Sequence, residues 1–313
     1  MDAFPDRLRA AIDRKGCPIV VGIDPRLDLM PAHVVQSSFA RYGHTHDAAS
    51  MAIREYNLRL LDGIAPHVPA VKIQVAFYEA FGPSGMQVFA DTLSAARQRG
   101  LIVIADVKRG DIEMTAQAYA AAYLASSLPS VMLGPGFDAD AITVNPYVGG
   151  DGVLPFVTAA KTAGKGIFIL VKTSNPTSGD LQNLLVDGRP LYERLAELVQ
   201  QWGQGTEGIT GYQAVGAVVG ATYPAEAARL RGLMPHTYFL VPGYGAQGAG
   251  ASDVQACFNA DGHGAIINSS RAIMYAYRQQ AYRTFGEEHY PEASRAAVLA
   301  MKEELAAVLR TPS

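Results

Sequence analysis

Eight short apolar runs follow one another along the chain, with helical patterns between them. We expect the runs to form strands at Pro18–Asp24, Ala70–Ala76, Leu101–Lys108, Ala141–Asn145, Ile167–Lys172, Ala214–Gly220, Thr237–Pro242 and Gly264–Asn268. The helical patterns lie at Ser50–Asp62, Gly85–Gln98, Thr115–Ala125, Gly152–Ala163, Leu191–Trp202, Ala225–Leu230 and Asp253–Asn259. Continuous apolar runs that alternate with helices predict a parallel sheet covered by helices. Eight such units favour an α/β fold, a (β/α)8 TIM barrel, over an open doubly wound sheet.

The chain has 313 residues, enough for two average domains, but (β/α)8 barrels reach this length as one domain. No Pro/Ser-rich linker divides it, so we expect a single barrel domain over residues 1–313. Two loop insertions, Asp28–Ala49 and Ser174–Tyr212, and a C-terminal helical extension from about Glu292 to Arg310 are expected as additions. Both insertions follow strands, on the face where barrel active sites form, and could be lids or interface elements.

Composition excludes several classes of protein. The net charge of −3 gives no general attraction to nucleic acid or to an acidic membrane. No stretch approaches the roughly 18 apolar residues of a membrane span, and Met1 to Arg14 lacks the apolar run of a signal peptide. We therefore expect a cytoplasmic protein with no membrane and no nucleic-acid partner.

Metal-type patterns are weak in this chain. Cys17 and Cys257 are too few for a disulfide framework, and neither has the spacing of a metal ligand. His44-Thr45-His46-Asp47 resembles a ligand cluster, but it lies in a polar stretch without a convincing further ligand. We expect a solvated loop there and no metal site.

The segment Asp106-Val107-Lys108-Arg109-Gly110-Asp111-Ile112 places two carboxylates and an ammonium where the third strand ends. In an extended strand, residues i and i+2 share a face, so Asp106 and Lys108 are expected to point into the same space. Asp111 lies beyond the strand and could reach a different site, including one in another subunit. Charges beside a buried strand end are costly unless they are paired, and such pairs are often functional. A surface loop with a salt bridge is the simpler alternative.

Polar residues also lie within or directly after the other expected strands. They are Asp24, Lys72, Asn145, Thr173-Ser174, Thr222, the Pro242–Gly250 loop and Ser270-Arg271. In a barrel, function collects at the C-terminal ends of the strands. Lys172 also ends a strand and could equally be a paired structural lysine.

The Pro242–Gly250 loop is rich in glycine and precedes an expected helix. Successive N–H groups in such a loop can form a nest for phosphate, and Arg271 could add a bidentate contact. The loops after strands seven and eight are where barrels usually hold a phosphate. Gly243, Gly245 and Gly248 also match the dinucleotide pattern G-x-G-x-x-G, but only one strand follows and no acidic residue lies at the expected distance. A phosphorylated substrate is therefore favoured over a nicotinamide cofactor.

The chain resembles the orotidine 5′-phosphate decarboxylase family over most of the barrel, and its length is similar to that of a longer, divergent bacterial branch. The motifs that match are Asp106-x-Lys108-x-x-Asp111-Ile112, Gly22-Ile23-Asp24-Pro25, Val71-Lys72-Ile73, Thr115, Ser174-Asn175-Pro176, Gly245-Ala246-Gln247-Gly248 and Arg271. One departure is Ser270-Arg271-Ala272, where many members have Gly-Arg-Ser.

The resemblance implies decarboxylation of orotidine 5′-phosphate to uridine 5′-phosphate and CO2 in de novo pyrimidine synthesis, without metal or organic cofactor. Lys108 would stabilise and protonate the carbanion at C6 of the pyrimidine. Asp106, and Asp111 of the partner subunit, would keep Lys108 charged, while Lys72 pairs with Asp106. A homodimer with shared active sites follows. The residues implied to bind substrate are Asp24, Lys72 and Thr115 at the ribose, Ser174 at the uracil edge, and Gly245, Gln247, Gly248 and Arg271 at the phosphate.

Two other functions remain open. A related barrel uses the same Asp-x-Lys-x-x-Asp pattern with Mg²⁺ and acts on keto-sugar phosphates as an aldolase or decarboxylase. A catalytically silent barrel could bind a nucleotide as a sensor or scaffold. The Arg109-Gly110 pair, the Ser174-Asn175-Pro176 turn and the Gln247 loop fit the nucleotide enzyme better than the first, and the presence of Lys108 and Asp111 argues against the second.

Overall fold

The structure is a computed structural model that describes residues 2–125, 134–245 and 248–309. Its parallel strands close into a barrel in the order β1-β10-β9-β8-β5-β4-β3-β2, so each barrel strand pairs with the barrel strands that precede and follow it in the chain. The barrel strands are β1 (Ile19–Ile23), β2 (Ala70–Gln74), β3 (Ile102–Arg109), β4 (Ala141–Val144), β5 (Gly166–Lys172), β8 (Val215–Val219), β9 (Phe239–Val241) and β10 (Ala265–Ser269). The predicted TIM barrel is confirmed.

The barrel strands are buried almost throughout. Every residue of β1, β4, β8, β9 and β10 is buried. A strand that is covered on both faces needs apolar side chains at successive positions, not at alternate ones. This is why each strand is visible in the sequence as a continuous apolar run.

The chain divides into two compact units, which are described in turn. The first contains Ala11–Val107 and Ser269–Ala306, and the second Met1–Ala10, Lys108–Asn268 and Ala307–Ser313. The boundary falls within β3, between Val107 and Lys108. The expectation of a single barrel domain stays a prediction.

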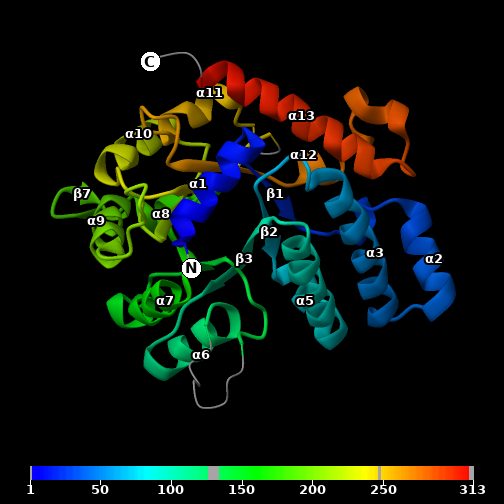
Figure 1. The fold of residues 1–313 in the computed structure, drawn as a ribbon, viewed down its shortest axis with the longest axis horizontal. Helices are drawn as coiled ribbons and strands as arrows, with labels where there is room; N and C mark the ends of the chain where they lie inside the picture. The colour runs from blue at the N-terminus through cyan, green and yellow to red at the C-terminus, as the bar shows by residue number, and fades with distance from the viewer. Residues whose placement is uncertain (1, 126–133, 246–247, 310–313) are drawn as a thin grey trace. The chain divides into compact units, whose positions relative to one another are not determined.

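In the first unit, β1, β2 and β3 pair in parallel, with Gly22 opposite Lys72 and Gln74 opposite Asp106. Its helices are α2 (Ala32–Tyr42), α3 (His46–Ile64), α4 (Ala76–Glu79), α5 (Gly82–Gln98), α12 (Arg271–Met274) and α13 (Tyr290–Leu309). Helix α3 packs against α5 and α2 (Figure 1). Helix α13, the predicted C-terminal extension, contacts α3 so closely that a Cβ on Gly63 would lie 2.7 Å from Pro291 O.

In the second unit, β5 pairs with β4 and β8, and β9 pairs with β8 and β10. Its helices are α6 (Glu113–Tyr123), α7 (Gly150–Ala163), α8 (Gly179–Gln182), α9 (Leu191–Gly203), α10 (Pro224–Leu233) and α11 (Ala251–Val254). The helix expected at Asp253–Asn259 is wrong in extent: α11 is followed by a short 3-10 turn at Gln255–Cys257. Helix α1 (Phe4–Lys15) spans residues of both units and was not expected from the sequence.

The two expected insertions have regular structure. Asp28–Ala49 contains most of a 3-10 turn (Leu27–Leu29), then α2 and the start of α3. The loop expected at His44–Asp47 is partly wrong, because Thr45 is the N-cap of α3 and accepts a hydrogen bond from Ala48 N (3.1 Å). Ser174–Tyr212 contains a 3-10 turn (Pro176–Ser178), α8, the hairpin of β6 (Leu185–Val186) and β7 (Arg189–Pro190), and α9.

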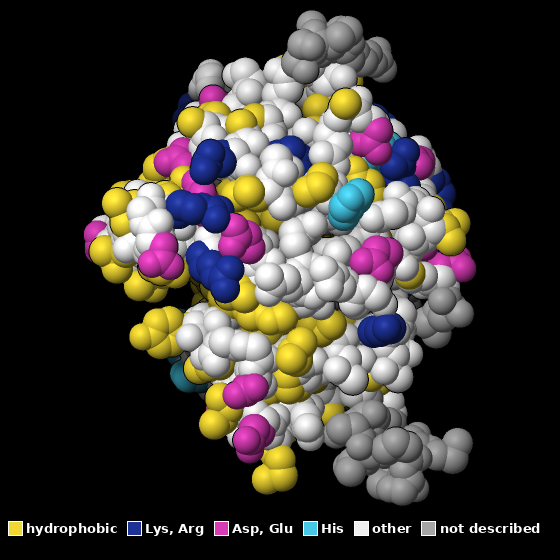
Figure 2. Space-filling view, turned by 90° about the vertical axis from the view of Figure 1, so that its left-hand side faces the viewer, with side chains coloured by type: hydrophobic (Ala, Val, Ile, Leu, Met, Phe, Trp, Pro, Cys, Tyr) yellow, Lys and Arg dark blue, Asp and Glu magenta, His cyan; other side chains and the backbone are white. Residues whose placement is uncertain are grey.

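Ion pairs cover the surface of α9 and α10. The buried carboxylate of Glu193 accepts from Arg189 and Arg229, and Glu197 pairs with Arg189 and Arg194. Figure 2 shows basic and acidic side chains next to one another on this side of the molecule. Among the helices of residues 2–125, 134–245 and 248–309, none combines the length and the hydropathy that a membrane span requires.

Candidate active site

A buried ion pair lies at the ends of β2 and β3. Lys72 Nζ is 2.6 Å from Asp106 Oδ2 and 3.9 Å from Asp24 Oδ1. Gln74 Nε2 donates a second hydrogen bond to Asp106 Oδ2 at 3.0 Å. The parallel register places Lys72 on the middle strand of β1–β2–β3, so that acids from both neighbouring strands meet it. The structure thus brings together three of the predicted site residues.

The charge state of Lys72 follows from this surrounding. Burial alone disfavours the ammonium, but the charges of Asp106 and Asp24 and the hydrogen bond to Asp106 outweigh it and raise the pKa of Lys72 above its usual value. A buried ammonium with two carboxylates is therefore a fixed cation at neutral pH.

The side chain of Asp24 has a carboxylate oxygen that can accept a further hydrogen bond. Its Oδ1 is buried, yet no hydrogen bond reaches that atom from the residues that the structure describes. The backbone of Asp24 is held in place, because its carbonyl accepts a hydrogen bond from Tyr275 OH at 3.2 Å. A buried carboxylate oxygen without a donor is costly, and a ligand hydroxyl would satisfy it.

Gln74 is a member of this site that was not predicted. The signal was available, because Gln74 lies two residues after Lys72 on β2, and residues i and i+2 of a strand share a face. Its amide fixes the Asp106 carboxylate from a second direction.

Lys108 lies two residues beyond Asp106 on β3, in the second unit. Its φ angle is 44°, in the left-handed region that non-glycine residues rarely adopt, and its backbone N–H donates to Thr143 Oγ1 at 2.9 Å. Strained backbone of this kind is found often at functional sites. The side chain is exposed, whereas Asp106 is buried. Because the backbone leaves the extended region at Lys108, strand alternation alone does not fix the direction of its side chain.

The turn after Lys108 is fixed against the end of β4. Asn145 N donates to Arg109 O at 2.8 Å. A Cβ on Gly110 would lie 2.8 Å from Asn145 O, so only glycine fits without a shift. The loop that carries Asp111 therefore leaves the barrel in a defined direction.

Asp111 and Thr115 lie at the start of α6. Asp111 is half-buried and its Oδ1 accepts from Ile112 N at 2.7 Å, while Thr115 is exposed. The apolar neighbours Ile112 and Met114 are 52% and 79% exposed. Two predicted site residues thus lie on a segment with exposed apolar side chains.

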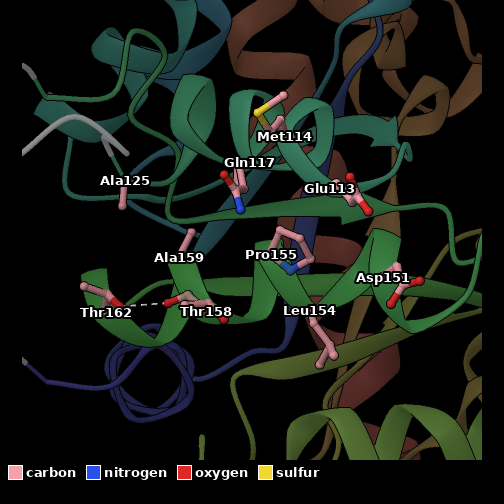
Figure 3. A pocket seen from close by; sticks show the side chains of 11 residues that line it. Glu113, Met114, Gln117, Ala125, Asp151, Leu154, Pro155, Thr158, Ala159 and Thr162 are labelled. Atoms are coloured by element: carbon pink, nitrogen blue, oxygen red, sulfur yellow. Dashed lines mark hydrogen bonds between the residues drawn. The ribbon is translucent and has the colours of Figure 1, made fainter.

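A cavity of about 820 Å³ lies between α6 and α7 beside this segment (Figure 3). Glu113 and Met114 line it from α6, and Leu154 and Pro155 line it from α7. Leu154, 47% exposed, extends the apolar surface onto α7.

Ser174 follows β5 and is half-buried. Its carbonyl accepts a hydrogen bond from Thr222 Oγ1 at 3.3 Å. A Cβ on Gly220 would lie 2.8 Å from Ser174 Cα, so the end of β8 approaches this residue closely. The backbone of Ser174 is therefore fixed from one side by the loop after β8.

Two backbone N–H groups of the predicted phosphate loop donate hydrogen bonds to carbonyls of the same loop. Gly245 and Gly248 have φ angles of 75° and 92°. Gly245 N donates to Ala249 O and Gly248 N donates to Gly245 O, both at 2.9 Å. These two N–H groups are therefore engaged within the loop. Gln247 lies outside the described residues, and Arg271 is exposed at the first position of α12.

Comparisons with known proteins agree with one another. The model of the orotidine 5′-phosphate decarboxylase / HUMPS family matches residues 18–285. The orotidine 5′-phosphate decarboxylase of Rhodopirellula baltica is 44% identical over 306 residues, 97% of this chain and 99% of that protein. That of Caldicellulosiruptor bescii is 38% identical over 92% of this chain and 94% of its own. The solved structure of Leishmania donovani OMP decarboxylase superposes with a TM-score of 0.72 at 32% identity, covering 99% of this chain and 100% of that one.

Proposed function

The chain belongs to the orotidine 5′-phosphate decarboxylase / HUMPS family, and we propose that it converts orotidine 5′-phosphate to uridine 5′-phosphate and CO2 for pyrimidine synthesis. The observation that carries this proposal is the buried Lys72–Asp106 pair, with Lys108 two residues further along β3. The Lys72–Asp106 pair is a preformed arrangement of charges near the end of a barrel strand, where barrel enzymes act.

The reaction breaks the bond between C6 and the carboxylate carbon, and CO2 leaves while the electron pair stays on C6. The Lys108 ammonium stabilises this negative charge and then gives its proton to C6. Two unit charges 4 Å apart attract by about 4 kcal/mol at an effective dielectric near 20. The carboxylates of Asp106 and of Asp111 of the partner subunit attract and orient the Lys108 ammonium in this way. Asp106 also repels the substrate carboxylate, which is relieved as CO2 leaves.

The remaining residues bind the nucleotide. Asp24 accepts from a ribose hydroxyl at its unsatisfied Oδ1, and Thr115 of the partner subunit assists. Ser174 contacts the uracil edge, and Gln247 and Arg271 contact the phosphate. Since the N–H groups of Gly245 and Gly248 are engaged in the loop, we assign their role to shaping it and the phosphate contact to the side chains.

A homodimer with shared sites is part of the proposal. Exposed apolar side chains that lie together mark protein–protein contacts more often than free surface. Met114 and Leu154 are exposed and line the cavity between α6 and α7 (Figure 3), and the exposed Ile112 directly follows Asp111 in the sequence. A second copy of the chain that covers this surface would bring Asp111 and Thr115 to its own site. We place this dimer in the cytoplasm.

The alternative function is that of a magnesium-dependent barrel with the same Asp-x-Lys-x-x-Asp pattern, which acts on keto-sugar phosphates. Asp106 Oδ2 already accepts hydrogen bonds from Lys72 Nζ at 2.6 Å and Gln74 Nε2 at 3.0 Å. A divalent cation that coordinated this oxygen would displace both donors, which disfavours Mg²⁺ there. This geometry favours the cofactor-independent reaction.

The test is the loss of the ultraviolet absorbance of orotidine 5′-phosphate on adding purified protein, with and without excess EDTA. Loss that EDTA does not change is the expected result. Loss that EDTA blocks would support the magnesium-dependent alternative. Tight binding of uridine 5′-phosphate without any loss would indicate the silent barrel.

A further inference from the structure

Lys172, the last residue of β5, is a buried lysine that the proposed reaction does not use. Its side chain is among the largest that are fully buried, at 1% exposure. Its Nζ donates to Asn183 Oδ1 at 2.7 Å and lies 3.4 Å from Ser178 Oγ. In the part of the chain that the structure describes, no carboxylate pairs with it. A buried ammonium without a counter-ion needs another source of stabilisation.

Two aromatic rings supply it. The ammonium lies 4.7 Å from the ring centre of Tyr223 and 5.3 Å from that of Tyr192. The face of an aromatic ring carries partial negative charge and attracts a cation, most strongly where water is excluded. Lys172 is therefore held by two rings, an amide oxygen and a hydroxyl.

These partners tie down the segment that carries Ser174. Asn183 and Ser178 belong to the stretch that begins directly after Lys172, so the hydrogen bond to Asn183 closes a loop of chain onto the end of β5. A second pair closes the same loop, since Thr173 N donates to Gln182 Oε1 at 3.0 Å and Gln182 Nε2 donates to Thr173 Oγ1 at 2.8 Å.

Tyr223 contacts both the Lys172 ammonium and the backbone of Asn175, the residue after Ser174. Its ring lies over Lys172, and its hydroxyl donates to Asn175 O at 3.4 Å. The neighbouring Thr222 holds Ser174 O. The segment around Ser174 is therefore held on one side by hydrogen bonds within the loop after β5 and on the other side by Thr222 and Tyr223. Lys172 contacts Asn183 on the first side and Tyr223 on the second.

We propose that Lys172 is a positioning residue that, through Asn183 and Tyr223, holds Ser174 in place to recognise the pyrimidine base. It acts on base recognition and not on the phosphate or the ribose, because its partners all surround the loop after β5. This inference rests on the proposed function, in which Ser174 contacts the uracil edge.

The experiment compares Lys172→Met with Lys165→Met. Lys165 is a matched control, a buried lysine just before the other end of β5 that pairs with Asp138 at 2.5 Å. For wild type and both variants, we would measure the KM for orotidine 5′-phosphate and the inhibition constants of uridine 5′-phosphate and ribose 5-phosphate. Ribose 5-phosphate carries no base, so it reports on the rest of the site.

Lys172→Met should raise the KM for orotidine 5′-phosphate and the inhibition constant of uridine 5′-phosphate about tenfold, the equivalent of one well-placed hydrogen bond. The inhibition constant of ribose 5-phosphate should stay within about twofold. Lys165→Met should leave all three constants near those of the wild type.

Equal weakening of both inhibitors by Lys172→Met, or unchanged binding of uridine 5′-phosphate, would overturn the inference. If Lys172→Met does not fold, Asn183→Ala decides, because Asn183 is exposed and its loss removes the same contact. It should weaken uridine 5′-phosphate selectively, by about threefold, and equal effects on both inhibitors would again contradict the proposal. Turnover of orotidine 5′-phosphate by the wild type tests the proposed function separately. If the wild type does not turn the substrate over, the proposed function and the role of Lys172 both fail. If it does, the results for the variants alone decide the role of Lys172.

Discussion

Lys72 Nζ lies 2.6 Å from Asp106 Oδ2, and the two side chains are only 7% and 6% exposed. A buried pair of this kind costs desolvation energy for both charges, so it contributes little net stability compared with apolar residues of the same volume. Its breakage is different, because the remaining charge is left buried and unpaired. Because the pair adds little stability, its presence indicates that the two charges serve the function of the site.

This distinction gives the first prediction. Lys72→Met should destabilise the fold by about 3–5 kcal/mol, because Asp106 keeps its charge without the ammonium. Lys72→Met combined with Asp106→Leu should recover much of that stability, but no activity. Unfolding in urea and the absorbance assay measure the two effects. A double variant as unstable as the single one would show that the unpaired charge is not the cause.

The second prediction concerns alkaline pH. Burial lowers the pKa of Lys72, but the charges of Asp106 and Asp24 raise it by more than burial lowers it. The folded protein therefore holds the proton more tightly than the unfolded chain. Such a group stabilises the fold fully below its unfolded pKa and loses this contribution as the pH rises through the folded pKa. The urea midpoint of the wild type should therefore fall above the ordinary lysine pKa of 10.5.

The double variant with Lys72→Met and Asp106→Leu is the control for this pH dependence. Buried tyrosines such as Tyr56, whose pKa is raised by burial, also contribute to the alkaline loss of stability, but they do so in both proteins. The wild type should lose more stability than the variant between pH 10 and 11.5, a range set by the lysine titration at about 10.5. Parallel curves would mean that the pKa of Lys72 is not raised.

The third prediction separates catalysis from stability. The Lys108 side chain is exposed, so Lys108→Ala should change the free energy of unfolding by no more than about 0.5 kcal/mol. Turnover should nevertheless be abolished, because the variant lacks both the cation and the proton donor. Lys161→Ala, which removes an exposed lysine from α7, is the matched control and should keep full activity. Activity of Lys108→Ala close to that of the wild type would disprove the assigned mechanism.

The strands and the central charges could be predicted because buried parallel strands leave continuous apolar runs, and charges at their ends are conspicuous. Helix α1 was missed because residues 1–14 are rich in charge. Yet Phe4, Leu8, Ala11 and Ile12 recur at helical spacing and are all buried, so the signal was present.

Other features depend on three-dimensional contacts that a pattern does not contain. The glycines of the Pro242–Gly250 loop indicated a phosphate nest, but composition does not reveal that Gly245 N and Gly248 N are bound to carbonyls of the loop itself. At the left-handed Lys108, the backbone N–H donates to Thr143 Oγ1, and the following carbonyl, of Arg109, accepts from Asn145 N; these partners come from the next strand and the loop after it. The aromatic rings around Lys172 come from α9, which contains Tyr192, and from Tyr223, the residue directly before α10.

The last prediction tests the shared site. Lys108→Ala and Asp111→Ala should each be inactive alone. If a site combines Lys108 of one subunit with Asp111 of the partner subunit, a hybrid dimer contains one site with both residues and one with neither. Random exchange between equal amounts should then restore about one quarter of the wild-type activity, since half of the dimers are hybrids and half of their sites are intact. Exchange can be followed with differently tagged subunits. If tagged hybrids form and no activity returns, Asp111 acts within its own subunit or not at all.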